Sequence, residues 1–232
     1  MIPYVICHMT TSVDGKVTGN FLYTPEAVPA TDLYYEINRR YAADAYACGR
    51  ITMEGSFTFG HQVDLSPYAD ASLPRTDYTA DPSARFFAVA FDRRGRLGWT
   101  TSRISDADPG YDNAHIIEVL CEDVSDAYLA YLREKKISYI FAGERELNVR
   151  LALEKLYSRF GIRRLLLEGG SILNGAFQKE DLIDELSLVV APLTAQENAL
   201  PLFAQGGLSN YSLRQAQTVE NNILYLNYIR TR

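Results

Sequence analysis

Short apolar runs alternate with helix-like patterns along most of this 232-residue chain. Residues 4–7, 86–91 and 115–120 have the length and the apolar side chains of buried strands. Between such runs, apolar residues recur at helical spacing, as Leu33 and Ile37 do. This alternation predicts the α/β class, with a mostly parallel central sheet flanked by helices.

Turn and capping residues mark where the elements begin and end. Thr31 or Asp32 can cap a first helix, Ser125 can cap a second, and Gly161 has the place of a C′ residue after a third. The turn Glu220-Asn221-Asn222 lies between two strand-like segments and predicts a C-terminal antiparallel hairpin. The expected strands are 4–7, 45–48, 86–91, 115–120, 138–142, 164–168 and 186–191, and two of the helices span 148–160 and 171–177.

Composition and charge limit the classes of function. Apolar residues make up 47% of the chain, which excludes global disorder. The 23 basic residues are outnumbered by 29 acidic ones, giving a formal charge of −6, so a broad basic surface for nucleic acid is not expected. An anionic ligand would have to be held by a few local cations and by backbone N–H groups.

The ends of the chain and its cysteines indicate the compartment. The N-terminal sequence MIPYVICHM does not resemble a signal peptide, and no apolar run approaches the ~20 residues that cross a bilayer. Cys7, Cys48 and Cys121 are odd in number and widely spaced, which disfavours disulfides and a structural zinc site. We therefore expect a cytoplasmic protein with buried cysteines, no metal and no membrane or nucleic-acid partner.

Two loose stretches, at about 59–83 and 100–113, interrupt the regular pattern. Strand-like segments resume on both sides of each stretch, which favours long loops over domain boundaries. We expect one domain over residues 1–232.

Polar and glycine-containing segments follow three of the expected strands. They are Gly49-Arg50-Ile51-Thr52, Asp92-Arg93-Arg94-Gly95 and Glu168-Gly169-Gly170-Ser171. Glycine lets the backbone approach a phosphate, a helix N-terminus offers free N–H donors, and arginine supplies a fork of donors. Ligands of open α/β sheets lie beyond the carboxyl ends of strands, so these segments predict a ligand with several phosphates, such as a dinucleotide.

Purely structural interpretations of the same segments stay open. Gly169-Gly170 can be a tight turn, Gly49 can simply end a strand, and Arg93 and Arg94 can lie in a polar hairpin. The chain contains neither the G-x-G-x-x-G spacing of a classical dinucleotide fold nor the sequence of a P-loop.

The chain as a whole resembles a known family. The pattern E-G-G-x-x-x-N, followed by I-D-E-L and a strand ending in Ala-Pro, is its most specific part, and S-x-D-G-K near the start is the second. The matching segments are Ser12-Val13-Asp14-Gly15-Lys16, Gly49-Arg50-Ile51-Thr52, 167–174, 182–186 and Ala191-Pro192. They are similar to the reductase domain of bacterial riboflavin-biosynthesis deaminase–reductases and to the stand-alone pyrimidine reductases of that pathway.

The resemblance implies a dihydrofolate-reductase-like fold, a homodimer, NADPH as cofactor and a phosphorylated pyrimidine as substrate. The ribosyl group of a phosphoribosylaminopyrimidine would be reduced at C1 to a ribityl chain. By the same resemblance, Gly169 and Gly170 would face the cofactor pyrophosphate, with Ser171 beside it. The remaining cofactor contacts would come from Gly49, Arg50 and Thr52, at the adenosine phosphates, and from Arg93 and Arg94, at the 2′-phosphate.

Two acidic residues are candidates for further roles. Asp14 follows the first strand, where the family's loop folds over nicotinamide and substrate, and a raised pKa would allow it to donate a proton. The alternative is that Asp14-Gly15 only forms a turn. Glu168 is expected to orient the glycine turn by accepting backbone N–H bonds, or to contact the cofactor.

The chain also departs from the bifunctional members of this family. It lacks the H-x-E and P-C-x-x-C motifs of their zinc deaminase domain, so deamination is not expected. It also lacks their acidic-proline stretch ending in arginine and has 53–57, Met-Glu-Gly-Ser-Phe, instead. Two alternatives therefore stay open: a related reductase of another pterin, pyrimidine or carbonyl substrate, and a nucleotide-binding relative without catalysis.

Overall fold

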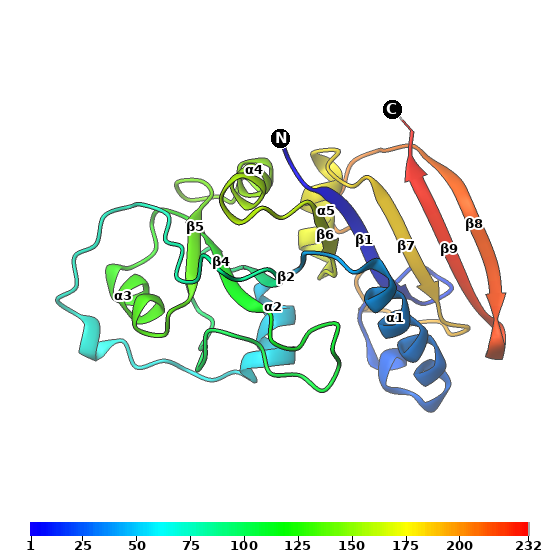
Figure 1. Cartoon of the computed structure of the whole chain (residues 1–232). Coiled ribbons are helices and arrows are strands. Elements are labelled where there is room, and N and C mark those ends of the chain that lie inside the picture. Colours follow the sequence, from blue (N-terminus) through cyan, green and yellow to red (C-terminus); the bar gives the residue numbers. More distant parts are fainter. Residues whose placement is uncertain (232) are drawn as a thin grey trace. The chain divides into compact units, whose positions relative to one another are not determined.

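The computed structural model describes residues 1–231 (Figure 1). The chain forms two compact units. Unit 1 consists of Met1–Pro3 and Asp44–Arg163, and unit 2 of Tyr4–Ala43 and the chain from Arg164 on. Among residues 1–231, no helix combines the length and the apolarity that crossing a membrane requires.

Unit 1 is built on a parallel sheet with the strand order β5-β4-β3-β2. The strands carry almost only buried side chains, as strands covered on both faces do. Helices α3 and α4 both contact β5. The elements are β2 (Ala45–Gly49), α2 (Arg50–Met53), a π-helical turn (Glu54–Thr58), a 3₁₀ turn (Ser66–Tyr68), β3 (Phe87–Phe91), β4 (His115–Leu120), α3 (Asp126–Glu134), β5 (Ser138–Phe141) and α4 (Val149–Phe160).

Capping residues set the helix ends of unit 1 as predicted. The Ser125 side chain accepts a hydrogen bond from the Tyr128 amide at 3.2 Å, and the Asn148 side chain accepts one from Leu151 at 2.9 Å. Gly161 follows α4 with a φ of 70°, a left-handed conformation that glycine adopts without strain.

Unit 2 has the strand order β6-β1-β7-β9-β8. Strands β6, β1 and β7 are parallel, and β9 and β8 continue the sheet antiparallel as a hairpin (Figure 1). Helix α1 packs on β1 and β7. The elements are β1 (Tyr4–Thr11), 3₁₀ turns (Asn20–Tyr23, Pro25–Ala27), α1 (Val28–Tyr41), β6 (Arg164–Leu167), α5 (Ser171–Lys179), β7 (Glu185–Val190), β8 (Tyr211–Val219), a 3₁₀ turn (Glu220–Asn222) and β9 (Ile223–Arg230).

Two boundaries in unit 2 differ from the prediction. Helix α1 begins at Val28 without a side-chain cap, because a 3₁₀ turn with Pro25 at its start leads directly into it. The capping role of Thr31 or Asp32 is therefore wrong, and the Thr31 hydroxyl instead donates to the Ala27 carbonyl. Strand β1 also continues to Thr11, four residues beyond its apolar run.

The predicted α/β class is confirmed, with parallel strands in both units and an antiparallel hairpin at the C-terminal end. The helices and strands alternate as expected. Polar segments consequently follow the carboxyl ends of β2, β3, β1 and β6, which is where the candidate site residues lie.

Candidate functional site

In unit 1, the carboxyl ends of β2 and β3 form an arginine-lined cavity. The two strands pair in parallel with Gly49 opposite Phe91, so the segments that follow them emerge side by side. The cavity measures about 270 Å³ and is lined by Arg50, Phe91, Asp92, Arg93, Arg94, Arg96 and Leu147. The structure thus brings together three of the predicted cofactor residues.

Ion pairs hold two of these arginines in place. Arg50 lies 2.7 Å from Glu54, one helical turn further on, and Arg93 lies 2.7 Å from the exposed Glu146. Arg94 is exposed to solvent. Gly49 precedes α2 as its N-cap, and Thr52 lies half-buried within that helix.

Asp92 is the acidic residue of this cavity, and it has a structural task. Its carboxylate accepts the backbone N–H groups of Arg96 and, at 2.8 Å, Leu97, which closes the loop after β3. Burial raises the pKa of Asp92, and the two N–H bonds oppose that rise. One carboxyl group and four arginines line the cavity, and two of these arginines are paired with glutamates outside its lining, so the remaining positive charge favours an anion.

A larger cavity adjoins this one in unit 1. It measures about 450 Å³ and shares Arg50 and Arg96 with the arginine-lined cavity. The loop after the π-helical turn supplies Val63 and Leu65 to its wall. Its combination of apolar and cationic groups suits a ring system that carries a phosphate.

In unit 2, a glycine turn connects β6 to α5. Strand β6 pairs in parallel with β1, and Glu168-Gly169-Gly170 follows it. The Gly169–Gly170 peptide bond is cis, and Gly169 has a φ of +95°. A Cβ on Gly169 would lie 3.2 Å from the Met9 Cε atom, a tight contact, and the positive φ strains any residue other than glycine here.

The N-terminus of α5 has no side-chain cap. Gly170 is the N-cap, and among residues 1–231 no side chain caps the helix. The N–H groups of the first turn and the positive end of the helix dipole are therefore available to an anion.

Glu168 and Ser171, on either side of the glycine pair, are tied to other segments of unit 2. The buried Glu168 accepts a hydrogen bond at 2.7 Å from Asn38 of α1. The Ser171 hydroxyl donates to the Pro201 carbonyl and accepts from the Ala204 amide at 3.1 Å. These contacts fix the two ends of the turn, and the predicted contacts of both residues with a cofactor stay predictions.

Asp14 lies in the exposed loop that follows β1. It accepts hydrogen bonds from the Ser12 hydroxyl at 2.6 Å and from the Ala195 amide at 3.1 Å. These two bonds, the first above all, hold the pKa of Asp14 below its usual value. The hypothesis of a raised pKa is therefore wrong, and Asp14 is an ionised carboxylate at neutral pH.

The segment 193–204 connects the Asp14 loop with the start of α5. Its Leu193 carbonyl accepts from Val13, and its Leu202 amide donates to Gly15, at 2.9 and 3.1 Å. In the same segment, the Ala204 amide donates a hydrogen bond to Ser171. The loop after β1 and the glycine turn therefore share one scaffold within unit 2.

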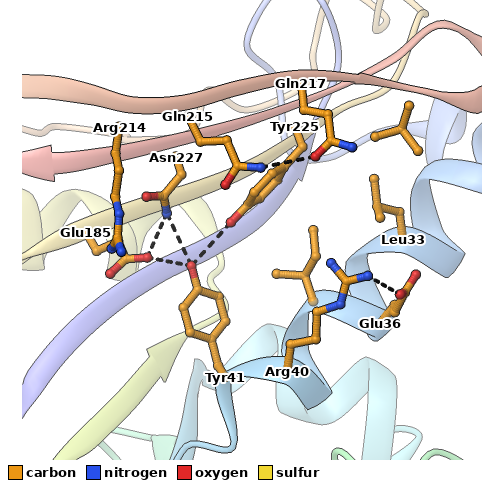
Figure 2. Close-up of a pocket in the computed structure, with 12 residues that line it drawn as sticks. Leu33, Glu36, Arg40, Tyr41, Glu185, Arg214, Gln215, Gln217, Tyr225 and Asn227 are labelled. Carbon is orange, nitrogen blue, oxygen red and sulfur yellow. Dashed lines mark hydrogen bonds and ion pairs between the residues drawn. The ribbon is translucent and has the colours of Figure 1, made fainter.

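A third cavity, of about 380 Å³, lies between α1 and the strands β7, β9 and β8 of unit 2 (Figure 2). On its floor, Glu185 accepts hydrogen bonds from Tyr41 at 2.6 Å and from Asn227 at 2.7 Å. Tyr4 donates to the other oxygen of the same carboxylate at 3.0 Å. Glu185 of β7 thus connects its strand with α1, β9 and β1 within unit 2.

The sequence analysis missed four residues that the structure connects to the site. Arg96 lies in the run 92–96 but one position beyond the segment singled out. Glu54 and Asn38 act through partners that only the fold reveals. Asn174 belongs to the E-G-G-x-x-x-N pattern without an assigned role. Among residues 1–231, no group of three or more His, Cys, Asp or Glu side chains has the arrangement of a metal site.

Comparison with known families identifies the class of this α/β protein. The profile of the RibD C-terminal domain family matches residues 87–225, more than half of the chain. The chain belongs to this family, which is the reductase family that the sequence resemblance indicated.

A curated relative supports the same assignment. The chain is 27% identical over 198 residues to 2,5-diamino-6-ribosylamino-4(3H)-pyrimidinone 5′-phosphate reductase of Methanothermobacter thermautotrophicus. The match covers 83% of this chain and 79% of that protein.

Solved structures share the fold. A pyrimidine reductase-like protein of Corynebacterium diphtheriae superposes with a TM-score of 0.69 at 17% identity, covering 99% of this chain and 92% of that one. RibD of Acinetobacter baumannii gives 0.63 at 22% identity, covering 100% of this chain and 59% of its own length. The riboflavin biosynthesis reductase Rib7 of Saccharomyces cerevisiae gives 0.65 at 13% identity, covering 99% and 90%.

Proposed function

We propose that this protein is an NADPH-dependent reductase of riboflavin biosynthesis that acts on a phosphoribosylaminopyrimidine. The arginine-lined cavity after β2 and β3 carries this proposal, because it offers four guanidinium groups to an anion in a protein of a reductase family. Membership of that family supports the reaction type, and the name of the curated relative supports the substrate class.

The residues present fit NADPH. The uncapped N-terminus of α5 and the side-chain-free turn at Gly169 and Gly170 would receive the pyrophosphate. Arg50, Arg93 and Arg94 would hold the phosphates of the adenosine half. Gly49 and Thr52 belong to the same segment as Arg50. Arg96 would add a further cation. Ser171 and Glu168 would keep the glycine turn in position from either side.

When bound, NADPH would supply the hydride that adds to C1 of the open-chain ribosylimine in its protonated form, so that the C1=N bond becomes a single bond and the nitrogen is left neutral. The protonated imine is the more electrophilic form. Asp14, as an ionised carboxylate, would accept a hydrogen bond from that cationic nitrogen and favour its protonation. We therefore assign Asp14 an electrostatic role and not that of a proton donor.

Turnover tests the proposal. Oxidation of NADPH is followed at 340 nm with the phosphoribosylaminopyrimidine and with a panel of unphosphorylated carbonyl compounds. Turnover restricted to the phosphorylated pyrimidine is expected. Turnover restricted to the panel would favour the related reductase of another substrate, and NADPH binding without any turnover would favour a non-catalytic nucleotide-binding protein. The cytoplasmic location, the single domain and the homodimer stay predictions.

A further inference from the structure

Helix α5 carries three buried polar side chains on one face. Ser171, Asn174 and Gln178 follow one another at spacings of three and four residues, which places them on the same side of the helix. Ser171 and Gln178 hydrogen bond with backbone groups of the segment 201–207. At both ends of this helix face, the polar side chain thus finds its hydrogen-bond partners in that segment.

Asn174, in the middle of this face, is the exception. It is completely buried, and neither its side-chain oxygen nor its nitrogen has a hydrogen-bond partner among residues 1–231. A carboxamide loses its bonds to water on burial, so a site that leaves both atoms unpaired destabilises the folded chain. An apolar side chain would avoid that loss.

The unpaired carboxamide lies next to the glycine turn. A Cβ built on Gly169 would be 3.8 Å from the Asn174 Nδ2 atom. The Asn174 backbone amide donates to the Gly170 carbonyl at 3.0 Å, as the first intrahelical bond of α5. The residue is therefore bonded to the turn through its backbone, and its side chain lies beside Gly169.

We propose that Asn174 is a positioning residue for nucleotide binding. Its carboxamide hydrogen bonds with the peptide groups of Gly169 and Gly170 when phosphates occupy the turn, and it is left unpaired when the turn is free. The unpaired carboxamide then destabilises only the nucleotide-free protein. Because binding removes this destabilisation, the affinity for the nucleotide is higher. This inference rests on the proposed function, because it assumes that the glycine turn receives a nucleotide.

Opposite shifts of stability and affinity test the inference. Asn174→Leu and Asn174→Ala both remove the unpaired carboxamide. The leucine side chain is larger than that of asparagine, and the alanine side chain is smaller. In the nucleotide-free protein we expect at least one of them to raise Tm by about 2–4 °C. For both we expect the Kd for NADPH, measured by titration calorimetry, to rise about tenfold.

Gln178→Leu is the matched control on the same helix face. Its amide nitrogen donates to the Gly207 carbonyl at 2.9 Å, so its removal is expected to lower Tm and to leave the Kd for NADPH unchanged. A purely structural effect of polar-to-apolar substitution on α5 would make Asn174 and Gln178 variants behave alike.

The outcomes separate the two levels of the proposal. If the wild type does not bind NADPH, the proposed function is overturned and the inference with it. If the wild type binds and both Asn174 variants bind equally well, the inference alone is overturned. A lower Tm in both variants also overturns it, because the carboxamide would then support the free fold.

Discussion

The two candidate phosphate sites use different parts of the polypeptide. The glycine turn of unit 2 offers backbone N–H groups and a helix dipole, and its conformation at Gly169 disfavours any side chain. The arginine-lined cavity of unit 1 offers guanidinium groups, two of them already paired with Glu54 and Glu146. A backbone site depends mainly on space and offers only a partial positive charge, whereas a side-chain site offers whole charges and responds strongly to each charge on the ligand.

The largest effect is expected where space is the requirement. Gly169→Val would add three carbon atoms where a Cβ alone already contacts Met9, in a backbone conformation that valine avoids. We expect its Kd for both NADPH and NADH to rise at least about 100-fold, which is about 2.7 kcal/mol of binding free energy. Titration calorimetry on the folded variant measures this.

Two further variants make this prediction specific. Gly170→Ala keeps an ordinary φ of −70° and should weaken both nucleotides without preventing folding. Gly55→Ala, where a Cβ has open space, should bind like the wild type. Affinity for NADPH at the wild-type level in a folded Gly169→Val protein would remove the pyrophosphate from this turn.

A smaller effect, confined to catalysis, is expected at Asp14. Asp14→Asn keeps the shape of the side chain but removes its charge, so kcat should fall about 10- to 100-fold with an unchanged Kd for NADPH. Because the Ser12 hydrogen bond lowers the pKa of Asp14, its carboxylate stays ionised below the usual range. The acidic limb that Asp14 contributes to the pH profile of kcat/KM should lie below the usual range of an aspartate and be absent in Asp14→Asn. An unchanged kcat would contradict the electrostatic role of Asp14 and leave it a structural role in its loop.

Selectivity between the two nicotinamide nucleotides should depend on the arginines alone. Arg94→Ala is expected to weaken NADPH about tenfold and to leave NADH unchanged, because only NADPH carries the 2′-phosphate. Arg150→Ala, which removes an exposed arginine of α4, is the control for a general change of charge. Equal losses for both nucleotides in Arg94→Ala would place this residue at a shared phosphate.

The smallest effect is expected in the pH dependence of folding stability, at a buried glutamate of unit 1. Glu118 of β4 is buried, and burial together with the nearby Asp92 raises its pKa well above the usual value. The folded protein keeps this proton where the unfolded chain releases it, so stability falls as the pH rises from about 4.5, the unfolded value, toward the folded pKa. Glu118→Gln should therefore gain a few degrees in Tm at pH 8 relative to wild type, but nothing at pH 4. An equal change at both pH values would contradict a neutral Glu118.

Much of the fold could be predicted because local signals agreed with the final structure. His115–Leu120 is a strand with the predicted bounds, and α4 ends at the predicted C′ residue Gly161. Strand β1 was predicted too short because its second half contains polar residues. His8 is one of them, and its partner Ser187 at 2.9 Å lies 179 positions away.

The site was less predictable, because its details depend on contacts between distant residues. Proximity of Arg50 to Arg93 followed from strand order, but the pKa of Asp14 depends on Ser12 and also on Ala195, which no motif indicates. The unpaired state of Asn174 is a property of its packed surroundings. Sequence patterns indicated the strand ends that carry the site, and the structure adds how each side chain there is held.

Titration of the wild-type protein with NADPH and with NADH tests the central claim, which is that this protein binds a phosphorylated dinucleotide. Both nucleotides should bind, NADPH at least about tenfold more tightly, since the arginines act on the 2′-phosphate. Equal affinities would remove Arg93 and Arg94 from the site, and failure of both nucleotides to bind would contradict the claim altogether.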